Sequence, residues 1–157
     1  MNYWLIKTEP GTYSWNDLKK EDKMTDHWDG IRNYQARNMI RDDIKVGDKA
    51  LFYHSVTPPL GIFGVVEIVR EAYPDTTAFD PKSKYFDPKS SPDSPRWFMF
   101  DVKATSEFVE PVLRDDLKEN SKLIDLMLLQ KGSRLSIQPV SAKHYKDICS
   151  MSKQVAL

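Results

Sequence analysis

The stretch GIFGVVEIVREAY, from Gly61 to Tyr73, is a long run rich in valine and isoleucine, residues that favour β-strands. Successive side chains of a strand point to opposite faces of the sheet. Both faces are apolar here, one with Ile62, Gly64, Val66 and Ile68 and the other with Phe63, Val65 and Val69. The run predicts a strand covered on both sides, as in a β-barrel with helices packed outside it.

Strands and helices are expected around this stretch in an irregular order. Period-two patterns and aromatic or β-branched runs predict strands at Tyr3 to Lys7, Lys49 to His54, Trp97 to Val102 and Leu135 to Val140. Helical spacing and N-cap residues predict helices at Trp15 to Lys20, Asn33 to Asp42, Leu113 to Glu119, Leu123 to Leu129 and from Ser141 to Cys149. Because the helices do not alternate regularly with the strands, an α+β fold is favoured over a parallel βαβ sheet.

The composition indicates one globular domain over residues 1–157, with 40% hydrophobic and 29% charged residues. Lys plus Arg equals Asp plus Glu at 23 each, so any nucleic-acid site must be local rather than an effect of net charge. The one cysteine, Cys149, excludes an internal disulfide and favours a reducing, cytoplasmic location. No apolar run reaches the roughly 18 residues of a membrane helix, so no membrane contact is expected.

Motifs of the common enzyme and cofactor classes are absent. The chain has no P-loop, no dinucleotide-binding glycine signature, no HExxH and no GxSxG. Its three histidines, His27, His54 and His144, lack metal-ligand spacing. We therefore expect neither a metal nor a cofactor.

The segment that leads into the second expected helix is dense in side chains that can contact a nucleic-acid base. Trp28 and Tyr34 offer planar faces, each worth about 1 to 3 kcal/mol per stacked base. Asn33 carries an amide that matches a base edge, and Arg32 at a helix start favours a phosphate. The alternative is structural: the two aromatics belong to the core, and Arg32 pairs with Asp29.

Three further clusters place polar groups along or at the ends of strands, where barrel mouths commonly bind ligands. They are Lys7-Thr8-Glu9, Phe52-Tyr53-His54-Ser55 and Arg134-Leu135-Ser136-Ile137-Gln138-Pro139. His54 equally fits a histidine of the core. In the third cluster, polar residues alternate with apolar ones, a pattern that a solvated sheet face also shows.

The segment from Pro74 to Pro95 is predicted to be a long loop. It holds five of the ten prolines and has no apolar period. Loops of this length inside a compact domain are uncommon and tend to be functional or mobile. The aromatics Phe79, Tyr85 and Phe86 indicate that this loop is pinned down.

The order and spacing of several motifs resemble the EVE domain family. These motifs are Trp4-Leu5-Ile6-Lys7-Thr8-Glu9-Pro10, the segment from Trp28 to Asn38, Phe52-Tyr53-His54-Ser55, Gly61-Ile62-Phe63-Gly64 and Arg134-Leu135-Ser136-Ile137-Gln138-Pro139. The resemblance implies a PUA-like mixed β-barrel with helices packed around it. It also implies a non-enzymatic role in binding modified bases of DNA or RNA, and the family includes nuclear proteins.

The resemblance further suggests positions for a binding site. The residues expected to border a base-binding pocket are Thr8, Trp28, Asn33, Tyr34, Tyr53, His54, Ser55 and Ser136. The residues expected near phosphates are Lys7, Arg32, Arg37 and Arg134. Trp28 would form a stacking wall, and Asn33 and Ser136 would read the base edge.

Two other functions stay open at this point. Family relatives of the ASCH type include small hydrolases of modified nucleosides, and Lys7, Thr8 and a carboxylate such as Glu9 or Glu67 would have to form their reactive group. Neighbouring residues of a strand face opposite ways, which counts against Lys7 and Thr8 acting together. A protein-interaction domain that uses the loop from Pro74 to Pro95 is the third possibility.

Overall fold

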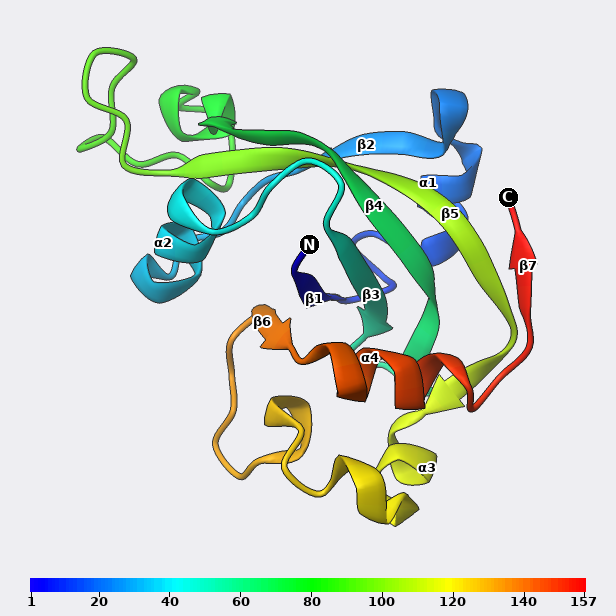
Figure 1. The fold of residues 1–157 in the computed structure, drawn as a ribbon. Helices are drawn as coiled ribbons and strands as arrows, with labels where there is room; N and C mark the ends of the chain where they lie inside the picture. Colours follow the sequence, from blue (N-terminus) through cyan, green and yellow to red (C-terminus); the bar gives the residue numbers. More distant parts are fainter.

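A strongly curved seven-stranded sheet forms the framework of the protein, for which a computed structural model describes all 157 residues (Figure 1). The strands are β1 (Tyr3–Thr8), β2 (Thr25–Trp28), β3 (Lys49–His54), β4 (Gly61–Pro74), β5 (Phe98–Leu113), β6 (Ile137–Val140) and β7 (Gln154–Ala156). Their order is β2-β5-β4-β3-β1-β6, and β7 pairs with β5. The β1–β3 pair is parallel and the others are antiparallel.

Four α-helices and four short 3₁₀ helices cover this sheet. The α-helices are α1 (Trp15–Lys20), α2 (Tyr34–Asp42), α3 (Arg114–Glu119) and α4 (Ala142–Cys149), and the 3₁₀ helices are η1 (Asp22–Met24), η2 (Thr76–Phe79), η3 (Ser121–Leu123) and η4 (Met127–Leu129). Ser14 and Asp17 form a reciprocal capping box at α1, and Ser141 caps α4. None of the helices combines the length and apolarity needed to cross a membrane.

The two faces of the sheet bury two separate hydrophobic clusters. Trp4 and Ile6 of β1 belong to a cluster of 17 residues that also takes in buried side chains of α1 and α2. Leu5, on the opposite face of the same strand, belongs to a cluster of 13 residues that includes buried side chains of α3 and α4. The two sets of helices accordingly pack on opposite faces, which is the α+β arrangement that the sequence predicts.

The long strand β4 is covered on both faces only over its first half. Its side chains also do not alternate strictly between the two faces as the sequence predicts. The pairing with β5 shifts between Ile62 and Gly64 and again between Val65 and Val66. A bulge reverses which face the following residues occupy. As a result Ile62 packs with Val65 in one cluster and Val66 lies in the other, and Val69 is exposed.

The barrel is open, because its edge strands β2 and β6 do not pair with each other. The sequence pattern also missed β2 and β7, and it ended the strand at Val102, whereas β5 continues to Leu113. Leu123 to Leu129 forms 3₁₀ turns instead of one helix, and the last predicted strand begins at Ile137. The remaining predicted strands and helices are confirmed to within one residue at most ends.

Candidate functional site

A cavity of about 570 Å³ lies where the two unpaired edges of the sheet approach each other. Its volume is in the range of small-molecule binding sites, about 300 to 1,000 Å³. It is lined by the end of β1, by β2, by the residue before β6 and by the β4–β5 connection. The lining residues are Lys7, Thr8, Glu9, Thr12, Tyr13, Asp26, His27, Trp28, Asp29, Gly30, Ile31, Lys84, Tyr85 and Ser136.

Trp28, the last residue of β2, joins the cavity to the core. Only 7% of its surface is exposed, and its ring packs edge-to-face with Phe52 at 5.5 Å and with Tyr13 at 6.1 Å between ring centroids. Edge-to-face pairs are favourable because the positive edge of one ring meets the negative face of the other. Trp28 is therefore held rigidly in the wall of the cavity.

The indole N–H of Trp28 differs from those of the other tryptophans. Trp4, Trp15 and Trp97 each donate this N–H to a carboxylate, namely that of Asp48, Glu107 and Asp87. No protein atom accepts the N–H of Trp28, and because no fully buried side-chain nitrogen lacks a partner, this nitrogen is not fully buried, in a residue that lines the cavity. It offers a fixed donor to a ligand.

Two hydrogen bonds fix the wall beside Trp28. The Thr8 hydroxyl donates to the Tyr13 carbonyl oxygen at 2.8 Å, and the Tyr13 hydroxyl donates to Asp26 Oδ2 at 2.7 Å. On the opposite edge, the Lys7 backbone N–H donates to the Ser136 carbonyl oxygen at 2.8 Å and sets the position of Ser136. The Ser136 hydroxyl itself has no partner within the protein and is available to a ligand.

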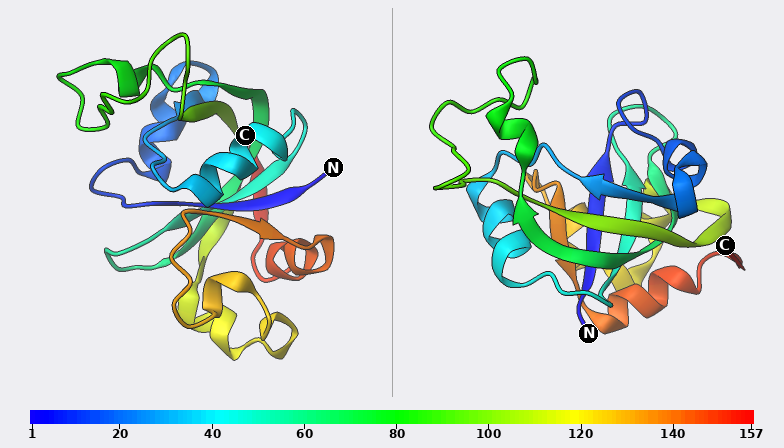
Figure 2. Two further views of the ribbon diagram at one scale, coloured as in Figure 1. Left: turned by 90° about the vertical axis from the view of Figure 1, so that its left-hand side faces the viewer. Right: turned by 90° about the horizontal axis from the view of Figure 1, so that it is seen from above.

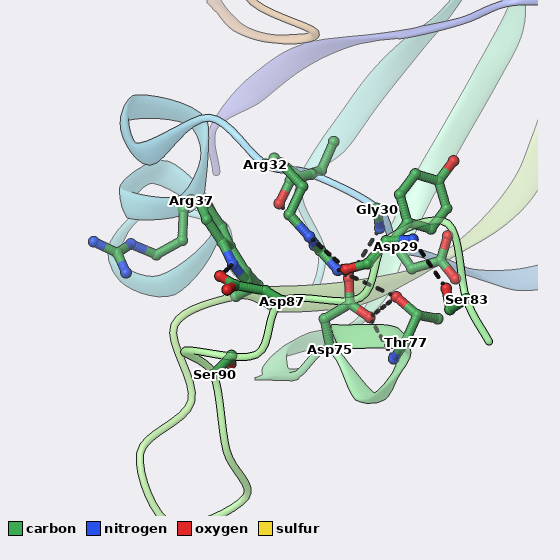
Figure 3. Close-up of polar contacts among 12 residues, drawn as sticks. Asp29, Gly30, Arg32, Arg37, Asp75, Thr77, Ser83, Asp87 and Ser90 are labelled. Carbon is green, nitrogen blue, oxygen red and sulfur yellow. Dashed lines mark hydrogen bonds and ion pairs between the residues drawn. The ribbon is translucent and has the colours of Figure 1, made fainter. Parts of the chain in front are cut away.

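The rest of the wall comes from the segment between β4 and β5, which extends beyond the sheet in Figure 2 (green). Its anchor is Asp75, whose side chain is fully buried. Oδ2 of Asp75 accepts from the Gly30 N–H at 2.9 Å and from Arg32 Nη1 at 3.0 Å, and Oδ1 accepts from the N–H of Thr77 at 2.9 Å. Figure 3 shows these groups converging on one carboxylate, which ties the segment to the turn after β2.

Arg32 donates all five of its N–H groups within the protein, four of them to the same segment. A guanidinium group has five N–H donors. Two of them go to the Tyr85 carbonyl oxygen, at 3.1 and 2.7 Å, and the others go to Asp75, to Thr77 Oγ1 and to the Ile31 carbonyl oxygen. In this arrangement no N–H of Arg32 is left for a phosphate, and its ionic partner is Asp75 instead of Asp29.

The ring of Tyr85 lies directly against Gly30. A Cβ atom at Gly30 would come within 2.5 Å of the Tyr85 ring, and the φ angle of Gly30 is +76°, a value that favours glycine. The backbone of Gly30 thus supports one part of the ring while the carbonyl group of Tyr85 is held by Arg32. These contacts keep Tyr85 in the cavity wall.

The cavity carries charge of both signs. Ionisable residues of both signs line it, namely the acidic Glu9, Asp26 and Asp29 and the basic Lys7 and Lys84. Burial raises the pKa of Asp29, against the opposing effect of His27. Burial lowers the pKa of Lys7, and the positive charge of Arg114 lowers it further. A ligand with both donors and acceptors fits such a wall better than a simple anion.

The pKa of Asp75 leads to a prediction on pH. Burial alone would raise it, but the hydrogen bonds from Thr77, Gly30 and Arg32 outweigh burial and hold it below its ordinary value of 3.8. The resulting stabilisation is complete above the unfolded-state pKa and is lost as the pH falls through the folded-state pKa. The free energy of unfolding, measured with urea, should fall more steeply between about pH 4 and 2 for the wild type than for Asp75→Asn. Parallel curves would contradict this role for Asp75.

Four of the residues predicted from the sequence line this cavity: Lys7, Thr8, Trp28 and Ser136. Tyr53 and His54 do not, because both are buried on β3, and His54 Nε2 accepts the backbone N–H of Trp15 at 3.0 Å. His54 is therefore a histidine of the core, which was the alternative open from the sequence. Burial lowers its pKa. The hydroxyl of Ser55 donates to the carbonyl oxygen of Thr8, behind the wall.

The predicted residues on and near α2 also lie outside the cavity. The side chain of Asn33 caps the helix by accepting the Ala36 N–H at 3.0 Å. Tyr34 is 52% exposed and packs on Trp97 at 4.8 Å between centroids. Arg37 donates to the carbonyl oxygen of Arg96, and Figure 3 shows it apart from the Asp75 cluster. Arg134 is exposed in the turn before β6.

Sequence reasoning missed most of the cavity wall, including Tyr13, Asp26, Asp29, Lys84 and Tyr85. The one available signal was the presence of aromatics in an otherwise polar loop. Gln138, predicted on a polar sheet face, is 1% exposed and donates to Ser133 Oγ and the Leu135 carbonyl oxygen, which orders the turn that carries Ser136. No group of three or more His, Cys, Asp or Glu side chains is arranged to hold a metal ion.

The open curved sheet, with helices on both faces and a polar and aromatic cavity at its edges, defines an α+β domain with a PUA-like fold. The sequence model of the family described as EVE domain matches residues 2–151 of this chain. The chain therefore belongs to the EVE domain family.

Relatives of this chain cover almost its whole length. Thymocyte nuclear protein 1 of Mus musculus is 38% identical over an alignment of 168 residues, gaps included. The alignment covers 97% of this chain and 74% of the relative. The crystal structure of a Pseudomonas syringae protein is similar with a TM-score of 0.89 at 43% identity, covering 95% of this chain and 98% of that one. The human THYN1 protein in complex with DNA containing 5-methylcytosine has a TM-score of 0.89 at 37% identity, covering 96% and 97%.

Proposed function

We propose that this protein is a nucleic-acid binding domain that takes a single base, in particular a modified cytosine, into the cavity beside Trp28. The observation that carries the proposal is a rigid tryptophan in the cavity wall whose N–H has no partner in the protein. The complex of the human relative with DNA containing 5-methylcytosine supports the same class of ligand. The non-enzymatic role expected from the family is part of this proposal.

The cavity matches the edge of a cytosine in its hydrogen-bonding groups. Carboxylates such as Asp29 and Glu9 can accept from the exocyclic amino group of cytosine. The indole N–H of Trp28 and the hydroxyl of Ser136 can donate to its ring acceptors. Extrusion of a base costs a few kcal/mol and least from a single strand, so single-stranded DNA or RNA is the easier ligand for a protein with no net charge.

The geometry gives less support to a nucleoside hydrolase. Lys7 shares its face of β1 with Leu5 and lies near Arg114, whereas Thr8 shares the other face with Ile6 and bonds to Tyr13. Side chains on opposite faces of a strand cannot act as a nucleophile and its base. RNA binding and a cytoplasmic location stay predictions.

The proposal predicts that binding depends on the base and on Trp28. An oligonucleotide with one 5-methylcytosine should bind more tightly than the same strand with an abasic site at that position, as measured by fluorescence anisotropy. Trp28→Ala should remove this difference, worth about 1 to 3 kcal/mol, because a base acceptor in the cavity is then left without its donor. Trp28→Phe, which keeps a ring but loses the N–H, should weaken binding about tenfold.

Tyr145→Ala is the matched control, because it removes a packed aromatic from the other core cluster, where Tyr145 stacks on Tyr3 at 4.2 Å. It should keep the preference for the base over the abasic site. Equal affinity of the wild type for both strands, or a preference that persists in Trp28→Ala, would refute the proposal.

A further inference from the structure

Lys7 and the three arginines Arg32, Arg37 and Arg134 are expected near phosphates, but the surroundings of Arg32 do not fit this role. Arg32 donates all five of its N–H groups to acceptors within the protein, two of them to the Tyr85 carbonyl oxygen. Its side chain is 23% exposed, and the carboxylate of Asp75 that it faces is fully buried. The ion pair is thus internal to the wall of the cavity.

The guanidinium group also lies near the faces of two aromatic rings. It lies 5.6 Å from the centroid of Tyr85 and 5.3 Å from that of Trp97. Contacts of this kind between a cation and the face of a ring are attractive. Arg32 therefore holds both the backbone and the ring of Tyr85, while Gly30 leaves room for the ring on its other side.

We infer that Arg32 is a positioning residue and that Tyr85, which it holds in place, determines which base the cavity accepts. The inference rests on the proposed function. Tyr85 is the only aromatic that the β4–β5 segment contributes to the cavity, and its carbonyl oxygen accepts two hydrogen bonds from Arg32. Its other polar contact is the hydrogen bond from its N–H to Ser83 Oγ at 3.1 Å. If Tyr85 shifts, the wall opposite the end of β1 opens, and bases of different size can enter.

The first arm of the test needs no ligand. In Arg32→Gln, the backbone amides of Gly30 and Thr77, which donate to Asp75, should exchange with deuterium about tenfold faster than in the wild type. Arg41→Gln is the control, because Arg41 lies exposed on α2 and pairs only with Asp42. Unchanged exchange in Arg32→Gln would overturn the positioning role, whatever the protein binds.

The second arm uses two single-stranded DNA oligomers, one with 5-methylcytosine and one with an abasic site in its place. Arg32→Gln should reduce the preference for the base, by no more than Tyr85→Ala reduces it, with unchanged affinity for the abasic strand. The salt dependence should also stay the same, since loss of a phosphate contact would lower its slope by about 0.7. A lower slope with the base preference intact would make Arg32 a phosphate contact and overturn the inference.

Tyr85→Ala keeps the proposal testable if Arg32→Gln folds poorly, because it leaves the Asp75 pair in place. It should lose base preference and keep the slope, and full preference in Tyr85→Ala would also overturn the inference. Absence of any base preference in the wild type would instead refute the proposed function, while the exchange measurement still decides the role of Arg32.

Discussion

Replacement of Asp75 with alanine is expected to lower the free energy of unfolding by about 3 kcal/mol. The carboxylate is fully buried, and its removal leaves the Arg32 charge without its ionic partner and one Arg32 N–H and the Gly30 and Thr77 amides without their acceptor. Removal of one partner of a buried pair costs about 3 to 5 kcal/mol. Because Arg32 is partly exposed and can regain some hydration, we expect the lower end of this range.

Urea unfolding of Asp75→Ala against Asp80→Ala measures this effect. Asp80 lies in the same segment, but it is exposed and its carboxylate accepts only the backbone N–H of Lys82. Its replacement should cost about 1 kcal/mol or less. If the two variants were equally stable, the account of Asp75 as the anchor of the cavity wall would fail.

The second large effect is expected for Gly30→Ala, which should both destabilise the fold and impair binding. The new Cβ would lie 2.5 Å from the Tyr85 ring, so the ring must leave its place. The positive φ angle of +76° adds a backbone cost of about 1 kcal/mol, and the overpacking adds about 1 to 3 kcal/mol. With Tyr85 displaced, the preference for 5-methylcytosine over an abasic site should fall about tenfold or more.

Gly132→Ala separates the two causes. Gly132 has a φ angle of +79°, close to that of Gly30, and nothing lies within 4 Å of the position of a Cβ atom there. It should show the backbone cost alone and keep full binding. Thermal unfolding and anisotropy on both variants measure the difference. Equal losses of stability and of binding in the two would show that the contact with Tyr85 has no consequence.

Local sequence signals account well for the framework of the fold. The capping residues Ser14 and Ser141 and the apolar spacing of α2 depend on neighbours a few residues away, and these helices agree with the prediction. β2 was not predicted because Thr25–Trp28 is short and mostly polar. It becomes a strand only through its pairing with β5. The bulges of β4 were equally invisible, since they depend on the register with β5.

The sequence predicted only those site residues that lie in recognisable motifs. Trp28 and Ser136 were found through their motifs, and both line the cavity. Arg32 was read as a phosphate contact because its real partners, Asp75 and the Tyr85 carbonyl oxygen, lie 43 and 53 residues further along the chain. Contacts at such separation leave no local pattern, so the wall formed by the β4–β5 segment could not be derived from spacing.

The indole N–H signals in a ¹H–¹⁵N NMR spectrum test the central claim most directly, because the protein has four tryptophans and only Trp28 has a free N–H. The signal of Trp28 is assigned from its absence in Trp28→Phe. Titration with a single strand that contains 5-methylcytosine should shift the Trp28 signal most, and the abasic strand should leave it in place. Binding that leaves the Trp28 signal unmoved while other residues respond would place the base elsewhere and contradict the account.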